Sequence, residues 1–337
     1  MRTGRALAAA GLIDREGIGA ADAVAARYTV AVTPHVAGLI ERGAADDAIA
    51  RQYLPDSGEL ARSPGERDDP IGDDARSPLP GVVHRYPDRV LLMPTTSCAV
   101  YCRFCFRRER VGRGGSAMSA EQIDAALAYV AARPAIREVI LTGGDPMILS
   151  PRRLGAILGR AAAIPSVEVL RIHSRVPVAD PARIDRALVA ALRQDVPVYV
   201  AIHVNHPREL DPAAARAIAQ LADAGLPLLA QTVLLKGVND DADTLAALFR
   251  ALVRHRVRPY YLHHPDLAPG TARFRLSIEQ GQALVRALRG RISGLCQPTY
   301  VIDIPGGYGK VPLGPSFRDV EGGLSDWQGN AHPDPHG

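Results

Sequence analysis

The sequence contains few cysteines, few lysines and no long hydrophobic run, and each of these features excludes a class of protein. None of the apolar stretches in its 337 residues is long enough to span a membrane. A short apolar run near the N-terminus is followed at once by charged residues, which predicts the start of a helix and not a signal peptide. Four cysteines, three of them clustered, do not form a disulfide framework. An exposed cluster of thiols needs a reducing compartment, so we expect the protein in the cytoplasm.

Runs of basic residues are also missing, although the net charge is +4 and the isoelectric point is about 9.0. The basic residues are spread among acidic ones and are not gathered with aromatic residues, which argues against nucleic acid as a substrate or partner. Hydrophobic residues make up 47% of the chain. This composition is typical of a globular protein, and the length suffices for one large core with or without an appended subdomain.

Lysine is scarce in an otherwise basic sequence. Of 40 lysine and arginine residues, only Lys236 and Lys310 are lysine. Arginine therefore serves nearly everywhere that a cation suffices. A lysine amine can lose its proton and then react with a carbonyl group, which arginine cannot do. Each of the two lysines is therefore a candidate for forming a Schiff base.

Three of the cysteines lie in one short segment, Cys98-Ala-Val-Tyr-Cys102-Arg-Phe-Cys105. Three close thiolates favour a soft metal centre. Structural zinc sites and ordinary [4Fe–4S] clusters take four protein ligands, so three thiolates leave one metal corner open to a small molecule. The alternative is a zinc knuckle that a distant histidine or Cys296 completes. The spacing favours the open cluster site.

Composition divides the chain into four segments. Residues 1–60 are predicted to form several alanine-rich helices, and residues 61–80 are rich in Pro, Gly, Asp and Arg, as in a linker or a wrapping arm. Residues 81–317 form the predicted core, and residues 318–337 form a polar tail.

Within the core, short apolar runs alternate with helical segments rich in Ala and Leu. Strands are predicted at Val90–Thr95, Glu138–Thr142, Val167–His173, Pro197–His203, Pro227–Leu235, Arg258–His263 and Thr299–Ile304. Helices are predicted at Ala120–Ala132, Pro151–Ala163, Pro181–Arg193, Asp211–Ala224, Asp240–His255 and Ile278–Leu288. This series is typical of buried parallel strands with right-handed crossovers. It favours an α/β fold with a partial (β/α)6 barrel, although an open doubly wound sheet has the same pattern.

Polar residues follow several predicted strands, at the end where barrel enzymes carry their chemistry. Gly143, Gly144 and Asp145 follow the second strand. The glycines allow a close backbone approach to a ligand and the carboxylate can accept from an ammonium, although Gly-Gly-Asp is also an ordinary turn. His203 ends the fourth strand, and Gln231 lies on the fifth. A single histidine is often structural, but polar residues on successive strands predict a cleft.

Charged residues also lie beside the first and last strands. Arg85 and Arg89 precede the first strand and could clamp a phosphate, or form a solvated, salt-bridged lead-in. Asp303 lies in the apolar last strand, where a carboxylate needs a partner. A glycine-rich loop then leads to Lys310, and a lysine on a mobile loop suits a carbonyl cofactor such as pyridoxal phosphate (PLP).

Together these segments resemble the lysine 2,3-aminomutase family, PLP-dependent enzymes that use S-adenosylmethionine (SAM) to start a radical reaction. The resemblance covers about residues 80–315 and is carried by HRYPDR, CAVYCRFCFRR, LTGGDP, RIHSR, NHP, QTVLLKGVND, RPYYLHHPDL and IDIPGGYGK. It implies a radical-SAM barrel with an N-terminal helical segment and a C-terminal strand and loop that carry the PLP lysine. It also implies three cofactors, namely a [4Fe–4S] cluster, SAM and PLP.

The resemblance implies a role for each motif residue. The implied ligands of the cluster are Cys98, Cys102 and Cys105. The residues implied to line SAM are Phe104, Gly143, Gly144, Asp145, His203 and Gln231. The implied PLP residues are Arg85 and Arg89 for the phosphate and Lys310 as the catalytic lysine. The implied substrate residues are Arg107 for the α-carboxylate and Asp266 and Asp303 for the ε-ammonium of lysine. A cation at one end and two carboxylates at the other favour a zwitterion with a cationic tail. For Asp266 the alternative is a turn carboxylate.

The implied activity converts L-lysine to β-lysine by moving the amino group from Cα to Cβ through a radical route. Such a route needs an electron-donating reductant such as flavodoxin or ferredoxin. One alternative is the same chemistry on arginine or another cationic amino acid. The other is a non-catalytic iron–sulfur or PLP-binding protein, which predicts missing motif residues, and none of the key residues is missing.

The sequence departs from the family pattern in its last third. Tyr308 stands where many relatives have a glycine, in the loop before Lys310. Larger members bind zinc through C-terminal cysteines, but only Cys296 follows Cys105. We therefore expect no structural zinc, and whether a homo-oligomer forms stays open. The Cys-Phe-Arg-Arg segment is closer to the branch that modifies elongation factor P, whereas the PGGYGK and HHPDL segments resemble the general branch.

Overall fold

The computed structural model describes the whole chain except residues 45, 113–114, 319–322 and 335–337. Its strands are β1 Val82–Tyr86, β2 Arg89–Thr95, β3 Glu138–Gly143, β4 Val169–Ser174, β5 Val198–His203, β6 Leu228–Val233, β7 Arg258–His263, β8 Thr299–Ile304, β9 Gly309–Pro312, β10 Leu324–Ser325 and β11 Ala331–His332. Its α-helices are α1 Gly4–Ala9, α2 Ile18–Arg27, α3 Pro34–Leu39, α4 Ala48–Tyr53, α5 Ala120–Ala131, α6 Pro151–Ala162, α7 Val176–Ala179, α8 Arg186–Leu192, α9 Pro212–Asp223, α10 Ala242–Arg254 and α11 Ile278–Leu288. The 3₁₀ helices used below are η1 Ser57–Leu60, η2 Asp74–Arg76, η3 Pro146–Ile148, η4 Pro181–Arg183 and η7 Gly294–Cys296.

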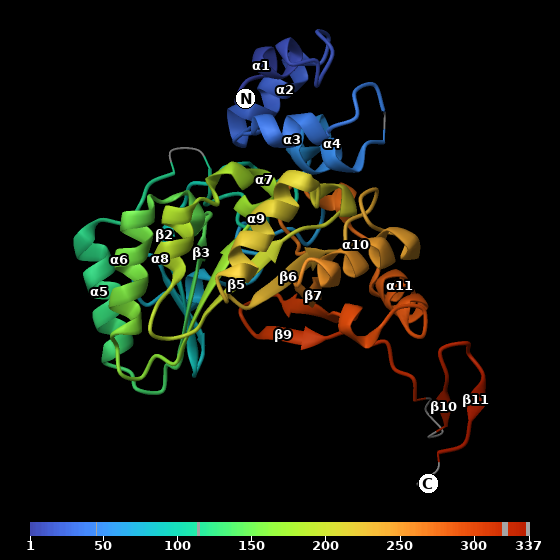
Figure 1. Ribbon diagram of the computed structural model, residues 1–337. Coiled ribbons are helices and arrows are strands. Elements are labelled where there is room, and N and C mark those ends of the chain that lie inside the picture. The colour runs from blue at the N-terminus through green and yellow to red at the C-terminus, as the bar shows by residue number, and fades with distance from the viewer. Residues whose placement is uncertain (45, 113–114, 319–322, 335–337) are drawn as a thin grey trace.

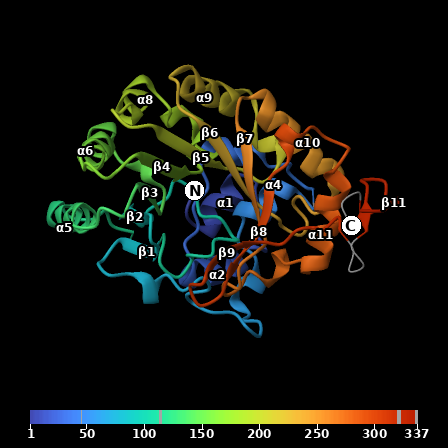
Figure 2. The same cartoon turned by 90° about the horizontal axis from the view of Figure 1, so that it is seen from below.

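One curved sheet organises the fold. Its nine strands lie in the order β1 to β9, so each strand pairs with its neighbours in the sequence. Strands β2 to β8 are parallel, whereas β1 and β9 pair antiparallel at the two edges. Seen from below, the strands curve around a centre, with α5, α6, α8, α9 and α10 outside them (Figure 2). The predicted partial (β/α)6 barrel is confirmed. A doubly wound sheet would reverse its strand order, so that alternative was wrong.

Each outer helix packs on the sheet through one apolar face. In α6 the buried residues are Leu154, Ile157, Leu158 and Ala161, which recur at the spacing of a single helix face. Strand β3 is buried at four successive positions, as expected for a parallel strand that is covered on both sides. These residues belong to one hydrophobic core that runs through the whole barrel. The core therefore holds the C-terminal ends of the strands in a constant arrangement.

The helix predicted at Pro181–Arg193 is two separate elements. Residues of η4 come first, and α8 begins only after Asp185, whose side chain accepts a hydrogen bond from the backbone N–H of Leu188. An aspartate that caps a helix in this way starts a new helix instead of continuing the previous one. The prediction of one long helix was wrong for this reason.

The two edge strands, β1 and β9, were not predicted. Strand β9 includes Lys310, which sequence analysis placed on a mobile loop. In the sheet Lys310 lies opposite Asp303 on β8. A four-residue strand that contains glycine and proline has little intrinsic preference for sheet structure, so only its pairing with β8 makes it a strand. The catalytic candidate is therefore held in register beside a carboxylate.

The N-terminal helices α1 to α4 lie over one end of the barrel, on the side of α7 (Figure 1). Leu7, Val36, Ile49 and Tyr53 form a second hydrophobic cluster with Val100 of the cysteine loop. Because α7 and the cysteine loop follow β4 and β2, this helical region covers the C-terminal ends of the strands. The opposite end of the chain leaves the barrel and forms the small β10–β11 hairpin (Figure 1). Among the described residues no helix has the length and hydrophobicity to cross a membrane.

Candidate active site

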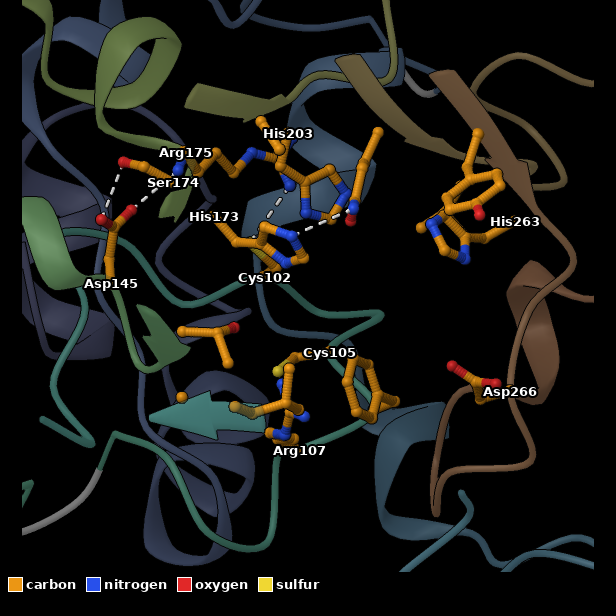
Figure 3. A pocket seen from close by; sticks show the side chains of 18 of the residues that line it. Cys102, Cys105, Arg107, Asp145, His173, Ser174, Arg175, His203, His263 and Asp266 are labelled. Atoms are coloured by element: carbon orange, nitrogen blue, oxygen red, sulfur yellow. Dashed lines mark hydrogen bonds between the residues drawn. The ribbon is translucent and has the colours of Figure 1, made fainter. Parts of the chain in front are cut away.

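A cavity of about 480 Å³ lies at the C-terminal ends of the strands and continues along their inner face. Every site residue predicted from the sequence lines it, namely Arg85, Arg89, Cys98, Cys102, Phe104, Cys105, Arg107, Gly143, Gly144, Asp145, His203, Gln231, Asp266, Asp303 and Lys310. The three thiols and Lys310 therefore face one space although they come from opposite edges of the sheet. Figure 3 shows Asp145 and Asp266 on opposite sides of this pocket, with Cys102 and Cys105 between them.

The three clustered cysteines line the cavity as partly buried free thiols. Burial raises the pKa of Cys98 and Cys102 and raises that of Cys105 to about 11. Three such thiolates side by side need a positive centre. No group of three or more His, Cys, Asp or Glu side chains among the described residues is arranged to hold a single ion. In an iron–sulfur cluster each thiolate binds a different iron, so three thiols that line one cavity fit that donor set.

The fourth cysteine is remote from this group. Cys296 lies on η7 and is buried in the hydrophobic core of the barrel. It does not line the cavity that contains Cys98, Cys102 and Cys105. The zinc knuckle completed by Cys296 is therefore not the arrangement in this structure.

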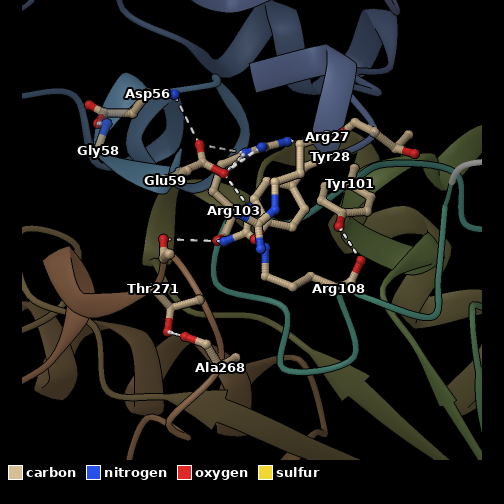
Figure 4. Close-up of polar contacts among 12 residues, drawn as sticks. Arg27, Tyr28, Asp56, Gly58, Glu59, Tyr101, Arg103, Arg108, Ala268 and Thr271 are labelled. Carbon is tan, nitrogen blue, oxygen red and sulfur yellow. Dashed lines mark hydrogen bonds and ion pairs between the residues drawn. The ribbon is translucent and has the colours of Figure 1, made fainter. Parts of the chain in front are cut away.

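One buried glutamate anchors the cysteine loop to the N-terminal region. Glu59 on η1 is fully buried and accepts two hydrogen bonds from Nε of Arg103, at 2.9 and 3.0 Å. The guanidinium of Arg108 binds the same carboxylate (Figure 4). Arg103 and Arg108 flank Cys105, the last cysteine of the loop. Because removing one partner leaves a buried charge, breaking this network costs about 3–5 kcal/mol. Sequence analysis did not single out Glu59.

A second buried ionic group lies next to Cys102. Arg175 donates from one terminal nitrogen to Sγ of Cys102 at 3.1 Å. Its other terminal nitrogen donates to Gln52 at 2.6 Å and to Glu209 at 2.7 Å. A cation is thus held against one thiol by an amide and a carboxylate from two other segments. The RIHSR motif contained Arg175, but nothing in the sequence indicated that it would contact Cys102.

The Gly-Gly-Asp segment packs against the cysteine loop. A Cβ on Gly144 would come within 2.1 Å of the carbonyl oxygen of Ser97, and Gly143 has a positive φ of 99°. The backbone of the cysteine loop therefore approaches these glycines closely, and both of them also line the cavity, where the role toward SAM stays a prediction. The backbone N–H groups of Gly144 and Asp145 donate to Thr95 and Ser97 at 2.8 Å each.

The carboxylate of Asp145 is hydrogen-bonded within the protein. It accepts from the hydroxyl of Ser174 at 2.7 Å and from the backbone N–H groups of Met147, Arg175 and Val176. Four protein donors therefore surround this carboxylate, which also lines the cavity, and its role beside SAM stays a prediction. Asp145 ties η3 and the end of β4 to the cysteine loop.

Neutral histidines line the inner face of the cavity. Burial holds the pKa of His173 and His203 well below the ordinary value, and that of His263 falls to about 3. The Nε2 atoms of His203 and His263 are buried without a hydrogen-bond partner among the described residues. Gln231 lies 3.3 Å from His173. These rings can accept or donate one hydrogen bond to a ligand and carry no charge at neutral pH.

The predicted phosphate and ammonium residues form an ion network. Asp303 accepts from Lys310 Nζ at 2.7 Å and from Arg85 at 3.2 Å. Arg85 also donates to Asp73 at 3.0 Å. The phosphate clamp of Arg85 and Arg89 stays a prediction, and the two arginines have different partners in the protein. Arg89 binds Asp88 at 2.7 Å. Both arginines line the cavity, but only Arg85 joins the network around Lys310.

Asp266 lies in the cavity without the partners that Asp303 has. Burial, followed by the negative charge of Asp303, raises the pKa of Asp266 to about 7. Asp266 and Asp303 thus lie near each other, and only Asp303 forms ion pairs with basic residues of the described chain. Such a pair attracts a cationic group into the cavity.

Comparison with known proteins assigns the chain to a family. Residues 92–249 match the family model of the radical SAM superfamily, and residues 285–319 match a model described as lysine-2,3-aminomutase. The L-lysine 2,3-aminomutase of Acetoanaerobium sticklandii is 45% identical over 288 residues, which cover 86% of this chain and 70% of that protein. The chain belongs to the lysine 2,3-aminomutase family. It is therefore a radical SAM enzyme of the isomerase class.

Other family members differ in the substrate that their names state. The L-lysine 2,3-aminomutase of Clostridium subterminale is 43% identical over 288 residues, covering 86% of this chain and 69% of that protein. The glutamate 2,3-aminomutase of Clostridioides difficile is 35% identical over 310 residues, covering 91% of this chain and 73% of that protein. Family membership thus establishes the type of chemistry, and the residues of the cavity must decide the substrate.

The cavity of this aminomutase fits the cofactors of its family, which are a [4Fe–4S] cluster, SAM and PLP. Three soft sulfur donors lie together under the cation of Arg175, and a primary amine lies in the same space. The ring of His203, whose Nε2 has no hydrogen-bond partner among the described residues, lies with its centroid 5.5 Å from that of Phe104. These observations match donor sets for an iron–sulfur centre, a carbonyl group and a polar ligand with an apolar face.

Proposed function

We propose that this protein is a PLP-dependent lysine 2,3-aminomutase that converts L-lysine to β-lysine. The observation that carries the proposal is the single cavity. Its lining includes three thiols, the one primary amine of Lys310, the guanidinium of Arg107, and the carboxylates of Asp266 and Asp303. A lysine substrate has a carboxylate at one end and an ammonium at the other, so this distribution of charge is complementary to it.

Arg107 would bind the α-carboxylate of the substrate. Its Nε donates to Asp73, while NH1 and NH2 donate to none of the described residues. A guanidinium offers two parallel donors to a carboxylate, which is a geometry that an ammonium cannot give. Asp266 and Asp303 would bind the ε-ammonium, in line with the raised pKa of Asp266.

When bound, the cluster with SAM supplies a radical that abstracts hydrogen, and PLP supplies a carbonyl that carries the migrating amine. Lys310 would attach to that carbonyl through Nζ. An amine must lose its proton before it reacts as a nucleophile. Oδ2 of Asp303 lies 2.7 Å from Nζ and is placed to take this proton. Asp303 would return this proton to the carbonyl oxygen, which leaves as water, and would then again be a charged carboxylate that can hold the ammonium of the substrate.

Other residues of the chain would keep water and stray charge out of the cavity. The N-terminal helices cover its mouth, and Phe104 packs at its inner end. His173, His203 and His263 are neutral because burial lowers the pKa of each. A reactive intermediate is protected where no proton donor or bulk water reaches it.

The proposal is tested by anaerobic reconstitution with iron, sulfide and PLP, followed by incubation with SAM, reductant and an amino acid. L-Lysine is expected to give a β-amino acid, and L-glutamate none, because the carboxylate pair repels an acidic side chain. L-Arginine is the informative competitor, since it carries a cation of another shape. If the loaded enzyme gives no β-amino acid from lysine, the substrate assignment is wrong.

Replacing Asp303 by asparagine is expected to weaken lysine binding by about 10- to 100-fold, the value of a hydrogen bond to a charged group. The cluster and SAM site should be little affected, so uncoupled formation of 5′-deoxyadenosine remains measurable. The apparent KM for lysine and the yield of 5′-deoxyadenosine are the measurements. Asp195→Asn is the control, because that aspartate lies on the exposed surface. A wild-type KM for Asp303→Asn would remove the ammonium role.

The affinity for lysine should depend on pH through Asp266. Its pKa of about 7 means that the carboxyl group is protonated and uncharged below that value. Lysine binding requires the charged form, so affinity should fall by about tenfold per pH unit below 7 and level off above it. Asp266→Asn removes the titrating group and should flatten the profile. Dissociation constants measured on both sides of pH 7 for the two proteins check this expectation.

A further inference from the structure

The segment of residues 61–80, here called the arm, reaches the active site at Asp73. The side chain of Asp73 is 1% exposed and lies between two arginines of different segments. Its Oδ2 accepts from Nε of Arg107 at 2.9 Å, and its Oδ1 accepts from Arg85 at 3.0 Å. Burial acts to raise the pKa of Asp73, but the guanidinium groups of Arg107 and Arg85 lower it below the ordinary value. The arm thus contributes a permanent negative charge to the site.

The position of Asp73 is set by the arm and by the loops around it. The carboxylate of Asp69 accepts from the backbone N–H groups of Asp73 and Asp74, at 2.9 and 2.7 Å. Gly72 has a positive φ of 70°, and a Cβ there would come within 2.5 Å of the backbone nitrogen of Gly307. The arm therefore packs directly on the glycine-rich loop before Lys310. This close packing leaves Asp73 little freedom to move.

The contact between Asp73 and Arg107 decides which edge of the guanidinium faces the cavity. Asp73 binds the Nε edge, and NH1 and NH2 make no hydrogen bond to the described residues. Arg107 lines the cavity. A planar guanidinium held at Nε has its two terminal nitrogens on the remaining edges, where they can bind the two oxygens of a carboxylate. Arginine loses side-chain entropy when it is held in one rotamer, and Asp73 removes that freedom before the ligand arrives.

We propose that Asp73 is a positioning residue through which the arm selects ligands with a free α-carboxylate. The inference rests on the proposed function, because it assigns the α-carboxylate to Arg107. Asp73 acts through Arg107 and does not touch the ligand. A neutral amide in place of the α-carboxylate gains nothing from an oriented Arg107. Asp73 should therefore affect the binding of an amino acid and the binding of its amide differently.

The test compares L-lysine with L-lysinamide as ligands of the enzyme loaded with its cluster and PLP. Dissociation constants are measured without reductant by following the absorbance of bound PLP. The preference for lysine is the dissociation constant of L-lysinamide divided by that of L-lysine. This ratio is expected to fall by about tenfold or more in Asp73→Asn, since a charge-assisted hydrogen bond to Arg107 is weakened. Asp74→Asn is the matched control. Its side chain is 76% exposed and pairs with Arg110, so the ratio should not change.

A general loss of folding or loading would not produce this pattern. The ratio is measured on the loaded fraction, and an unfolded fraction binds neither ligand. Asp73→Glu keeps the charge beside both arginines and is expected to recover part of the ratio, which also serves if Asp73→Asn loads poorly. A wild-type ratio in Asp73→Asn, together with a collapsed ratio in Arg107→Leu, overturns the inference and leaves the proposed function standing. No preference for lysine over lysinamide in the wild type overturns both.

Discussion

Replacing Lys310 by alanine is expected to abolish the aminomutase activity and the covalent attachment of PLP. Lys310 is the only lysine that lines the cavity, and its Nζ lies 2.7 Å from Oδ2 of Asp303. A missing nucleophile of this kind lowers turnover on the order of 10³- to 10⁶-fold, because the remaining groups cannot replace it. Turnover of L-lysine and the visible absorbance of bound PLP are the first two measurements.

The composition of the chain makes this prediction unusually sharp. Lys236 is the only other lysine and lies exposed outside the cavity. Lys236→Ala should therefore keep full activity. Borohydride reduction of the PLP-loaded protein should leave a pyridoxyl group on one peptide, which mass spectrometry assigns to one of two lysines. A label on Lys236, or an unchanged spectrum in Lys310→Ala, would remove Lys310 from the reaction.

Replacing Cys102 by alanine is expected to remove the iron–sulfur cluster. Cys102 is the thiol against which Arg175 is held, at 3.1 Å. A centre with only three protein ligands does not retain its iron when one is lost, so iron and sulfide should fall to background. The electron paramagnetic resonance signal of the reduced cluster should disappear with them, and formation of 5′-deoxyadenosine should stop. The bound PLP should remain, because Lys310 and the arginines around it are unchanged.

Cys296→Ala is the control for the cluster. Its thiol is buried among the helices of the core, so the substitution removes a small apolar group and costs about 1 kcal/mol or less of stability. Iron, sulfide and activity should stay at the wild-type level. The zinc knuckle makes the opposite prediction, with zinc in place of iron and loss of that zinc in Cys296→Ala. Metal analysis of the two variants separates these alternatives.

The residues that line the cavity could be predicted because each lies at a position that its own strand fixes. Cys98 and Asp145 follow β2 and β3, His203 ends β5, and parallel strands of one barrel end on the same side. Short apolar runs and helical segments are local patterns, so the strand order followed from them without knowledge of any contact. The errors of that prediction lay at α8, where a cap starts a new helix, and at β1 and β9, which pair at the edges of the sheet.

The roles of single carboxylates could not be predicted in the same way. Asp145 and Asp303 are both predicted to serve a ligand, and nothing in the sequence indicated that Asp145 also accepts four bonds from the protein or that Asp303 also binds Lys310 and Arg85. Which donors surround a carboxylate depends on loops that meet only after folding. The sequence contains no local signal for such contacts, since aspartate is equally suited to a turn, a cap or an ion pair.

Local sequence patterns and contacts made on folding thus determined different features of this protein. The spacing of three thiols, the scarcity of lysine and the alternation of strands and helices specify the chemistry and the barrel, because they act over a few residues along the chain. The partners of the buried charges were set by folding, when Glu59, Asp73 and Arg175 met groups from distant segments. Asp73 lies in an arm rich in acidic and basic residues, and several of its acidic residues could have paired with Arg107. Only close packing around Gly72 makes one of them part of the active site, because burial requires each charge to have a fixed partner.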